Sequence, residues 1–124
     1  MNVLFADDNP ETRELFSLCF SLQGHVAHTA DNGIEALKVV ERNQEALDIL
    51  ILDHHMPQMT GLEVVAQLRE RVELSCIPII LFTGTNKEEV ESQANALGVR
   101  RVVYKPILPF ELIATAQEVV EKAK

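Results

Sequence analysis

Cysteine is scarce in this sequence, and tryptophan is absent. The two cysteines, Cys19 and Cys76, lie far apart without a CxxC spacing, and both have apolar neighbours. We expect buried, reduced thiols, which fits a cytoplasmic protein. No apolar run approaches the roughly 20 residues that cross a bilayer, and the first residues lack the basic segment of a signal peptide. Neither a membrane span nor secretion is therefore expected.

Basic residues are outnumbered: 11 lysines and arginines stand against 19 acidic residues, a net charge of −8. Nucleic acids and anionic membranes are bound by clusters of Lys and Arg, so we expect direct binding to neither. The length of 124 residues suits one domain, residues 1–124, with 47% hydrophobic and 24% charged residues. Such a chain is large enough to form a globular core.

Apolar segments alternate with segments that carry helix signals. Asn9 followed by Pro10 is typical of a helix start, and two pairs, Thr60 with Glu63 and Thr85 with Glu88, each form a capping box. Such alternation with short connections predicts an α/β fold, a parallel sheet with helices on both faces. Strands are expected at about residues 3–6, 25–30, 48–53, 77–82 and 102–104, and helices at about 10–23, 34–43, 61–71, 86–97 and 109–124.

The apolar positions of the first predicted helix cover a wide arc, about 200°. The prediction is a well-buried helix whose stripe edges, Leu18 and Phe20, are partly exposed. The alternative interpretation is that this edge docks a partner.

Polar side chains follow four of the predicted strands. Asp7 and Asp8 follow the first, Asp53 ends the third, and Thr83 and Lys105 follow the fourth and fifth. One such aspartate could simply cap a turn, but parallel strands bring these ends to one edge of the sheet. Carboxylates gathered there repel each other unless a cation holds them. Oxygen ligands favour Mg²⁺, with Mn²⁺ as a substitute, and Lys105 balances the remaining charge.

A carboxylate, a metal, a hydroxyl and an ammonium are the parts required to transfer a phosphoryl group to a carboxylate. In this hypothesis Asp53 attacks phosphorus in line, while the metal and Lys105 neutralise the equatorial oxygens. Thr83 and the backbone amides after Asp53 donate hydrogen bonds to the same oxygens. Water later hydrolyses the acyl phosphate by the same route.

The chain resembles the response-regulator receiver domains of two-component signalling, in particular the chemotaxis regulators. The spacings of 30 residues from Asp53 to Thr83 and 22 from Thr83 to Lys105 match the family. The motifs that carry the resemblance are Asp7-Asp8, Asp53-x-x-Met56-Pro57 with Gly61, Thr83-Gly84 and Lys105-Pro106.

The resemblance implies a flavodoxin-like, doubly wound (βα)5 fold with strand order 2-1-3-4-5. It implies that Asp53 is the phosphoacceptor and that Thr83 and Lys105 contact the phosphoryl group. The domain would catalyse only its own phosphorylation and dephosphorylation, and is not expected to be an enzyme in the wider sense. The implied metal ligands are Asp8, Asp53, the backbone carbonyl of His55 and, through water, Asp7.

The resemblance also implies partners. The phosphoryl donor would be the phosphohistidine of a sensor histidine kinase or of a histidine phosphotransfer protein. The signal would leave through the surface formed by the fourth helix, fifth strand and fifth helix, to a downstream protein or to an output domain, none of which is predicted within these 124 residues. We expect a monomer or a dimer linked to phosphorylation.

The sequence departs from the family at the position three before Lys105, which is usually aromatic and here is Val102. Tyr104 lies two residues further on and therefore on the same strand face. Two interpretations stay open: Tyr104 is a packing residue, or it partly substitutes for the missing aromatic side chain.

A second departure concerns the lifetime of the phosphoryl group. Family members tune it from the positions two after the phosphoacceptor and two after the threonine, here His55 and Thr85. We expect these two residues to position or exclude water. The alternative for His55 is a solvent-facing loop side chain.

Other classes fit less well. A haloacid-dehalogenase-like phosphatase needs a second aspartate where His55 stands, and the acidic pair Asp7-Asp8 would repel the phosphate of a flavodoxin cofactor. A receiver that acts without phosphorylation, as an interaction module, remains the alternative.

Overall fold

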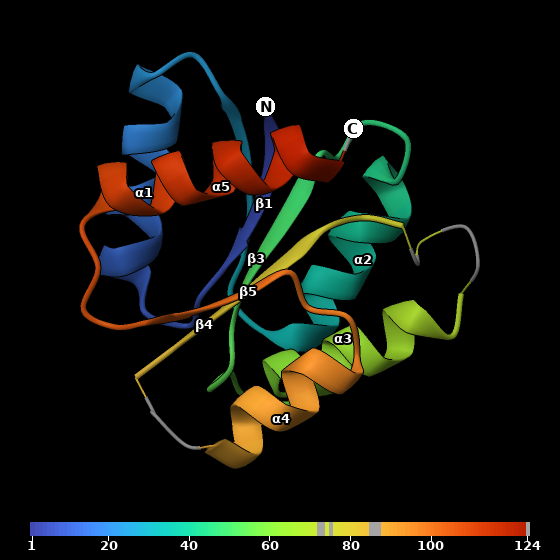
Figure 1. Cartoon of the computed structure of the whole chain (residues 1–124). Helices are drawn as coiled ribbons and strands as arrows, with labels where there is room; N and C mark the ends of the chain where they lie inside the picture. Colours follow the sequence, from blue (N-terminus) through green and yellow to red (C-terminus); the bar gives the residue numbers. More distant parts are fainter. Residues whose placement is uncertain (72–73, 75, 85–87, 124) are drawn as a thin grey trace.

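The computed structural model describes residues 1–71, 74, 76–84 and 88–123. Strands and helices alternate along the chain, as predicted (Figure 1). The strands are β1 (Asn2–Ala6), β2 (Val26–Ala30), β3 (Ile49–Asp53), β4 (Ile79–Thr83) and β5 (Arg101–Tyr104). The helices are α1 (Pro10–Leu22), α2 (Gly33–Asn43), α3 (Gly61–Arg69), α4 (Glu88–Ala96) and α5 (Pro109–Ala123).

The strands form one parallel sheet in the order β2-β1-β3-β4-β5. This confirms the predicted flavodoxin-like fold and its strand order. The central strand β3 is buried along its whole length, because helices cover both faces of the sheet. In the part of the chain that the structure describes, no helix is both long and apolar enough to cross a membrane.

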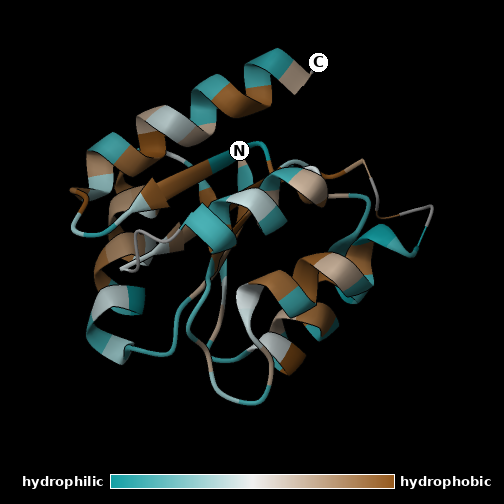
Figure 2. Ribbon diagram, turned by 60° about the horizontal axis from the view of Figure 1, so that its bottom comes forward, coloured by the Kyte–Doolittle hydropathy of each residue, from teal (hydrophilic) through white to brown (hydrophobic). Residues whose placement is uncertain are grey.

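Each face of the sheet has its own apolar core. Helices α1 and α5 cover one face, where Phe5 stacks on Phe16 with ring centroids 5.1 Å apart. Helices α2, α3 and α4 lie over the other face (Figure 1). The helices alternate between hydrophobic and hydrophilic bands along their length, as Figure 2 shows, which is typical of helices with one buried side.

Several local predictions were wrong. Phe20 was predicted to be partly exposed but is fully buried, whereas Leu18 is 56% exposed, in agreement with the prediction. Helix α1 packs through Phe16 and Phe20 rather than through the centre of its wide apolar stripe. Cys76 is exposed and Cys19 only partly buried, so neither is the fully buried thiol that was expected.

The observed start of β4 differs from the predicted one, residue 77. Strand β4 begins at Ile79, just after Pro78, which lacks a backbone donor for the sheet. The capping box predicted between Thr85 and Glu88 cannot be compared, because Thr85 lies outside the described residues. The corresponding box between Thr60 and Glu63 at the start of α3 is confirmed.

Candidate functional site

Three aspartates meet at the carboxyl end of the sheet. One carboxylate oxygen from each of Asp7, Asp8 and Asp53 lies within 4.8 Å of those of the other two. Asp7 is 0% exposed and Asp53 only 2% exposed, whereas Asp8 is exposed. Burying two carboxylates side by side is costly unless cations compensate their charge.

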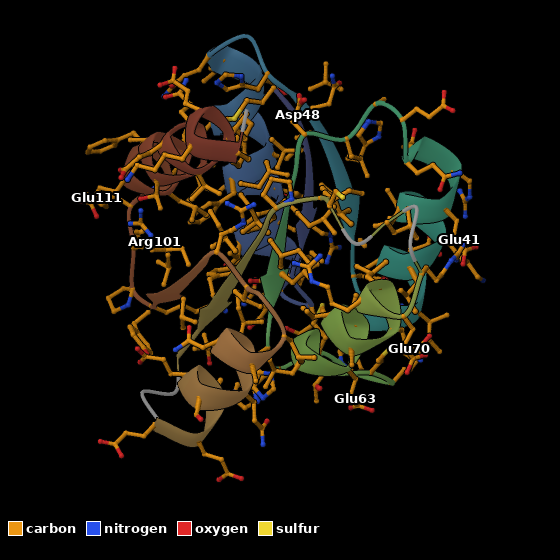
Figure 3. All side chains as sticks on the ribbon, turned by 45° about the vertical axis from the view of Figure 1, so that its right-hand side comes forward. Glu41, Asp48, Glu63, Glu70, Arg101 and Glu111 are labelled. Carbon is orange, nitrogen blue, oxygen red and sulfur yellow. The ribbon has the colours of Figure 1, made fainter. Side chains whose placement is uncertain are left out.

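Acidic side chains elsewhere behave differently. Glu41 on α2, Glu63 and Glu70 around α3, and Glu111 on α5 lie at the periphery and point outward, as Figure 3 shows. The burial of Asp7 and Asp53 at the strand ends is therefore a local feature and not a consequence of the acidic composition.

Lys105 supplies the cation that the structure places at this site. Its Nζ lies 3.2 Å from Oδ2 of Asp53 and 3.3 Å from Oδ2 of Asp7. The same ammonium lies 4.5 Å from the centroid of the Phe82 ring, a cation–π contact. The backbone amide of Lys105 donates to the carbonyl of Thr83 at 2.8 Å, which holds the start of this segment against β4. The Lys105–Pro106 peptide bond is cis.

Backbone amides and one arginine hold the aspartates in place. The amide of Asn9 donates to Oδ1 of Asp7 at 2.8 Å, and that of His55 donates to Oδ1 of Asp53 at 3.3 Å. Arg13 Nη1 donates to the backbone carbonyl of Asp7 at 2.9 Å. Neither Arg13 nor Asn9 was predicted to be a site residue, because their positions in the sequence indicate an ordinary helix residue for Arg13 and a helix cap for Asn9.

Burial raises the pKa of Asp53 above its ordinary value, and the charge of Asp7 raises it further. The Lys105 ammonium and the His55 amide act in the opposite direction on the same pKa. The raised pKa means that the surroundings of Asp53 leave its negative charge incompletely compensated, and an additional cation would compensate it.

Gly61, the first residue of α3, allows the loop after β3 to close tightly over Asp53. A Cβ at this position would lie 2.6 Å from the Asp53 carbonyl oxygen and 2.8 Å from Cδ1 of Leu81. Its amide donates to the carbonyl of His54 at 2.9 Å. A glycine is therefore required here by close approach of the backbone.

Thr83 ends β4 at the same edge of the sheet and is fully buried. It follows Leu81 by two residues and so shares the face that α3 and α4 cover. Asp53 follows Ile51 by two and shares the face of α1 and α5. The predicted residues thus meet at one edge, but Thr83 reaches it from the other side of the sheet.

The predicted modulators lie in different surroundings. His55 is exposed, and its ring centroid lies 4.9 Å from that of His54. Val102 packs against the core between the sheet and α3/α4. Tyr104 is only partly buried, and its hydroxyl donates a hydrogen bond to the Glu91 carboxylate on α4. Thr85 lies outside the described residues.

Comparison with known proteins identifies the class. The family model of the response regulator receiver domain matches residues 3–117. The chain belongs to this family.

Individual proteins with related sequences match most or all of this chain. A CheY chemotaxis protein homolog of Campylobacter jejuni is 30% identical over 110 residues, which cover 88% of this chain and 84% of that protein. Response regulator MprA of Mycobacterium leprae is 31% identical over 124 residues, which cover 100% of this chain but 53% of that protein. The chain therefore spans about half the length of MprA, and 88% of an uncharacterized 14.6 kDa protein of Leptolyngbya boryana that is 34% identical.

Solved structures share the fold. The chemotaxis protein CheY4 of Vibrio cholerae has a TM-score of 0.87 and 31% sequence identity, with 95% of this chain and 97% of that chain covered. The receiver domain of the Francisella response regulator 1452 has a TM-score of 0.89 at 24% identity, covering 99% of this chain and 98% of that chain. The second likeness concerns the fold alone.

Proposed function

We propose that this receiver domain accepts a phosphoryl group on Asp53 and that the acceptance depends on Mg²⁺. The observation that carries the proposal is the arrangement of Asp7, Asp8 and Asp53 within 4.8 Å of one another, with Lys105 against two of them. A fold needs no buried carboxylate pair at a strand end for stability, so the arrangement favours a chemical role.

The donor set fits a hard divalent cation. Three carboxylates carry three negative charges, which one divalent ion and Lys105 together neutralise. Oxygen ligands of this kind suit Mg²⁺, or Mn²⁺ in its place. We assign Asp8, Asp53 and the His55 carbonyl as direct ligands and Asp7 as a ligand through water. When bound, the ion supplies positive charge to the oxygens of the phosphoryl group that is transferred.

The remaining roles fall to residues of the chain. Asp53 provides the nucleophilic oxygen that bonds to phosphorus, while the bond from phosphorus to the donor's histidine nitrogen breaks and that nitrogen keeps the electron pair. The burial of Asp53 excludes bulk water from this step. Lys105 approaches Asp53 closely enough to pair with a phosphoryl oxygen added there. The hydroxyl of Thr83 donates a hydrogen bond to a phosphoryl oxygen on Asp53. Because Thr83 lies on the opposite face of the sheet, its side chain must move toward Asp53 to do so.

Partners follow from this chemistry. The donor is a phosphohistidine of a sensor histidine kinase or of a phosphotransfer protein, and a cytoplasmic location suits such a partner. The output acts through α4, β5 and α5 on a downstream protein or an output domain. The domain works as a monomer or as a dimer that phosphorylation promotes. The lengths of relatives such as MprA support an output domain in some family members.

The alternative is a pseudo-receiver that acts without phosphorylation. Acetyl phosphate, a small acyl-phosphate donor, separates the two in a labelling experiment with and without Mg²⁺. The proposed function predicts Mg²⁺-dependent incorporation that Asp53→Asn abolishes. A folded wild-type protein that binds Mg²⁺ but incorporates nothing from acetyl phosphate or phosphoramidate would support the pseudo-receiver.

A further inference from the structure

A groove separates α3 from α4, which lie side by side over the same face of the sheet (Figure 1). Its volume is about 400 Å³. Small-molecule sites in proteins commonly occupy roughly 300–1,000 Å³. Ala66 of α3 and Ala96 of α4 line the groove, and their short side chains leave this space unfilled. The groove is therefore large enough for a compact ligand of one or two rings.

The interior of the groove is apolar. Leu62 is buried, Ala66 and Leu97 are half-buried, and all three line it. Of the described hydrophobic residues that are both large and exposed, none lies on α3 or α4. A docked protein surface would need such residues around the groove, whereas a small molecule needs only the apolar interior. The groove therefore suits a free molecule better than a protein partner.

His54 contributes an unsatisfied hydrogen-bonding atom to this apolar groove. The residue lines the groove, and its Nδ1 is buried without a hydrogen-bond partner among the described residues. In the part of the chain that the structure describes, no other buried side-chain nitrogen or oxygen is left in this state. A buried polar atom without a partner lowers stability, and the great majority of such atoms in native proteins are paired. The Nδ1 atom therefore indicates a partner that enters the groove from outside.

The chemistry of the imidazole specifies what this partner offers. A neutral imidazole carries one N–H donor and one acceptor nitrogen. Buried N–H groups without an acceptor are rarer in folded proteins than under-satisfied acceptors. We therefore assign the proton of His54 to Nε2, which is not enclosed in this way, and the acceptor lone pair to Nδ1. A ligand that completes the site must donate an N–H or O–H group to Nδ1.

The groove is held in shape by hydrogen bonds to the backbone. The His54 amide donates to the Phe82 carbonyl at 3.1 Å, and the His54 carbonyl accepts from the Gly61 amide at 2.9 Å. Arg69, at the end of α3, donates from Nε to the Leu97 carbonyl just after α4 at 2.8 Å. This contact links the ends of the two helices. A groove fixed in this way needs little rearrangement when a ligand binds, which favours affinity.

Charge around the groove disfavours anions. Among the described lining residues, Glu63 is the one with a charge, and Figure 3 shows it at the periphery of α3. Its Oε1 accepts hydrogen bonds from the amide and the hydroxyl of Thr60, at 3.2 and 3.1 Å. A carboxylate fixed at the groove, in a chain with a net charge of −8, repels a negatively charged ligand. An uncharged ligand avoids this repulsion and the cost of desolvating an ion in apolar surroundings.

We propose that the groove between α3 and α4 binds a small, uncharged aromatic molecule with one N–H or O–H donor, the chemical class of indole and phenol. The ring lies against Leu62 and Leu97, between Ala66 and Ala96, and its donor meets Nδ1 of His54. The site uses none of the side chains of the aspartate cluster. The proposal therefore does not rest on the proposed function.

The test uses indole as the probe and benzofuran as its matched control, because benzofuran has an oxygen where indole has its N–H group. Backbone amide NMR shifts of the whole chain, recorded during a titration, locate and quantify the binding of each molecule. Wild type should show saturable shifts of amides in α3 and α4 and should bind indole about fivefold more tightly than benzofuran, as expected for one neutral hydrogen bond. No saturable shift up to the solubility limit of indole, or equal affinities for the two molecules, would overturn the proposal.

A substitution of His54 tests the hydrogen bond itself. His54→Phe retains an aromatic ring at the groove and removes the acceptor nitrogen. This variant should bind indole and benzofuran with equal affinity, close to that of wild type for benzofuran. A preference for indole that persists in His54→Phe would overturn the role of Nδ1.

A second pair of variants tests the location. Ala66→Leu fills the groove and should weaken the binding of both molecules by about tenfold or more. Ala114→Leu is the same replacement at an exposed position of α5 and should leave both affinities at the wild-type values. Ala96→Leu, at an exposed position of α4, repeats the test if Ala66→Leu fails to fold. Unchanged binding in a folded groove variant would overturn the site. Tighter binding of N-acetyltryptophanamide than of indole would overturn the assignment to a free molecule, in favour of a partner's tryptophan side chain.

Discussion

The ammonium of Lys105 lies 3.2 Å from Oδ2 of Asp53 and 3.3 Å from Oδ2 of Asp7, so that one lysine contacts two carboxylates. The two aspartates are almost completely buried. Lys105 therefore has two roles: it can pair with a phosphoryl oxygen, and it is the counter-ion of two buried carboxylates. Stability measured without phosphorylation tests the second role alone.

Replacement of the counter-ion should destabilise the metal-free protein. Lys105→Gln leaves two buried carboxylates uncompensated, and we expect the free energy of unfolding to fall by on the order of 1–3 kcal/mol. The side chain of Lys105 is 33% exposed, which places the loss toward the lower end. Urea unfolding in chelator measures it. The exposed Lys38→Gln is the control, and Lys105→Gln combined with Asp53→Asn should recover part of the loss.

The close approach at Gly61 predicts a steric effect. In Gly61→Ala the new methyl would lie 2.6 Å from the Asp53 carbonyl oxygen, so the loop after β3 must move. We expect a loss of roughly 1–3 kcal/mol in urea unfolding. Gly84→Ala is the matched control, because no atom of the described residues other than its chain neighbours lies within 4 Å of its Cβ position. Its stability should change by less than about 0.5 kcal/mol. Equal effects of the two substitutions would contradict this view.

Much of this architecture could be predicted from the sequence. The apolar runs that end in Asp7, Asp53 and Lys105 indicated both the parallel sheet and the edge at which these side chains meet. The exposure of α1 could not be predicted, because an apolar arc of about 200° does not show which part faces the sheet. Phe16 and Phe20 decide this by packing against other segments, which no local pattern records.

Two polar contacts also could not be predicted from the sequence. Arg13 contacts the backbone of Asp7, six residues earlier, and Tyr104 contacts Glu91, 13 residues earlier; both contacts depend on how the strands and helices pack. The prediction that Tyr104 lies on the same face as Val102 agrees with the structure, but its contact with α4 required the position of that helix.

His25 predicts a pH dependence of stability. Burial, and then the nearby Met1 ammonium at 2.9 Å from its Nδ1, lower the pKa of His25 in the folded protein. The unfolded state therefore binds the proton more readily, so the stabilising contribution of neutral His25 is complete above its unfolded pKa and is lost as the pH falls toward the folded one. His25→Asn should lose less stability than wild type between about pH 7.5 and 5. If the urea midpoints of the two proteins change in parallel across this pH range, either the sign of the predicted effect or its assignment to His25 is wrong.

The exposed side chain of His55 predicts an effect on phosphoryl lifetime. It follows Asp53 by two residues, and its backbone amide contacts that carboxylate at 3.3 Å. If its imidazole positions or excludes water, His55→Ala should change the decay rate of the acyl phosphate by roughly threefold or more. His28→Ala, on β2, serves as the control. An unchanged decay rate would leave His55 as a solvent-facing loop residue.

The most direct test of the central claim is the chemical location of the incorporated phosphoryl group. After reaction with acetyl phosphate and Mg²⁺, peptide mass analysis should place one phosphoryl group on Asp53. Hydroxylamine should remove this group, as expected for an acyl phosphate, and chelation of Mg²⁺ should prevent its incorporation. A hydroxylamine-stable group on His54 or His55, or equal labelling of wild type and Asp53→Asn, would contradict the account.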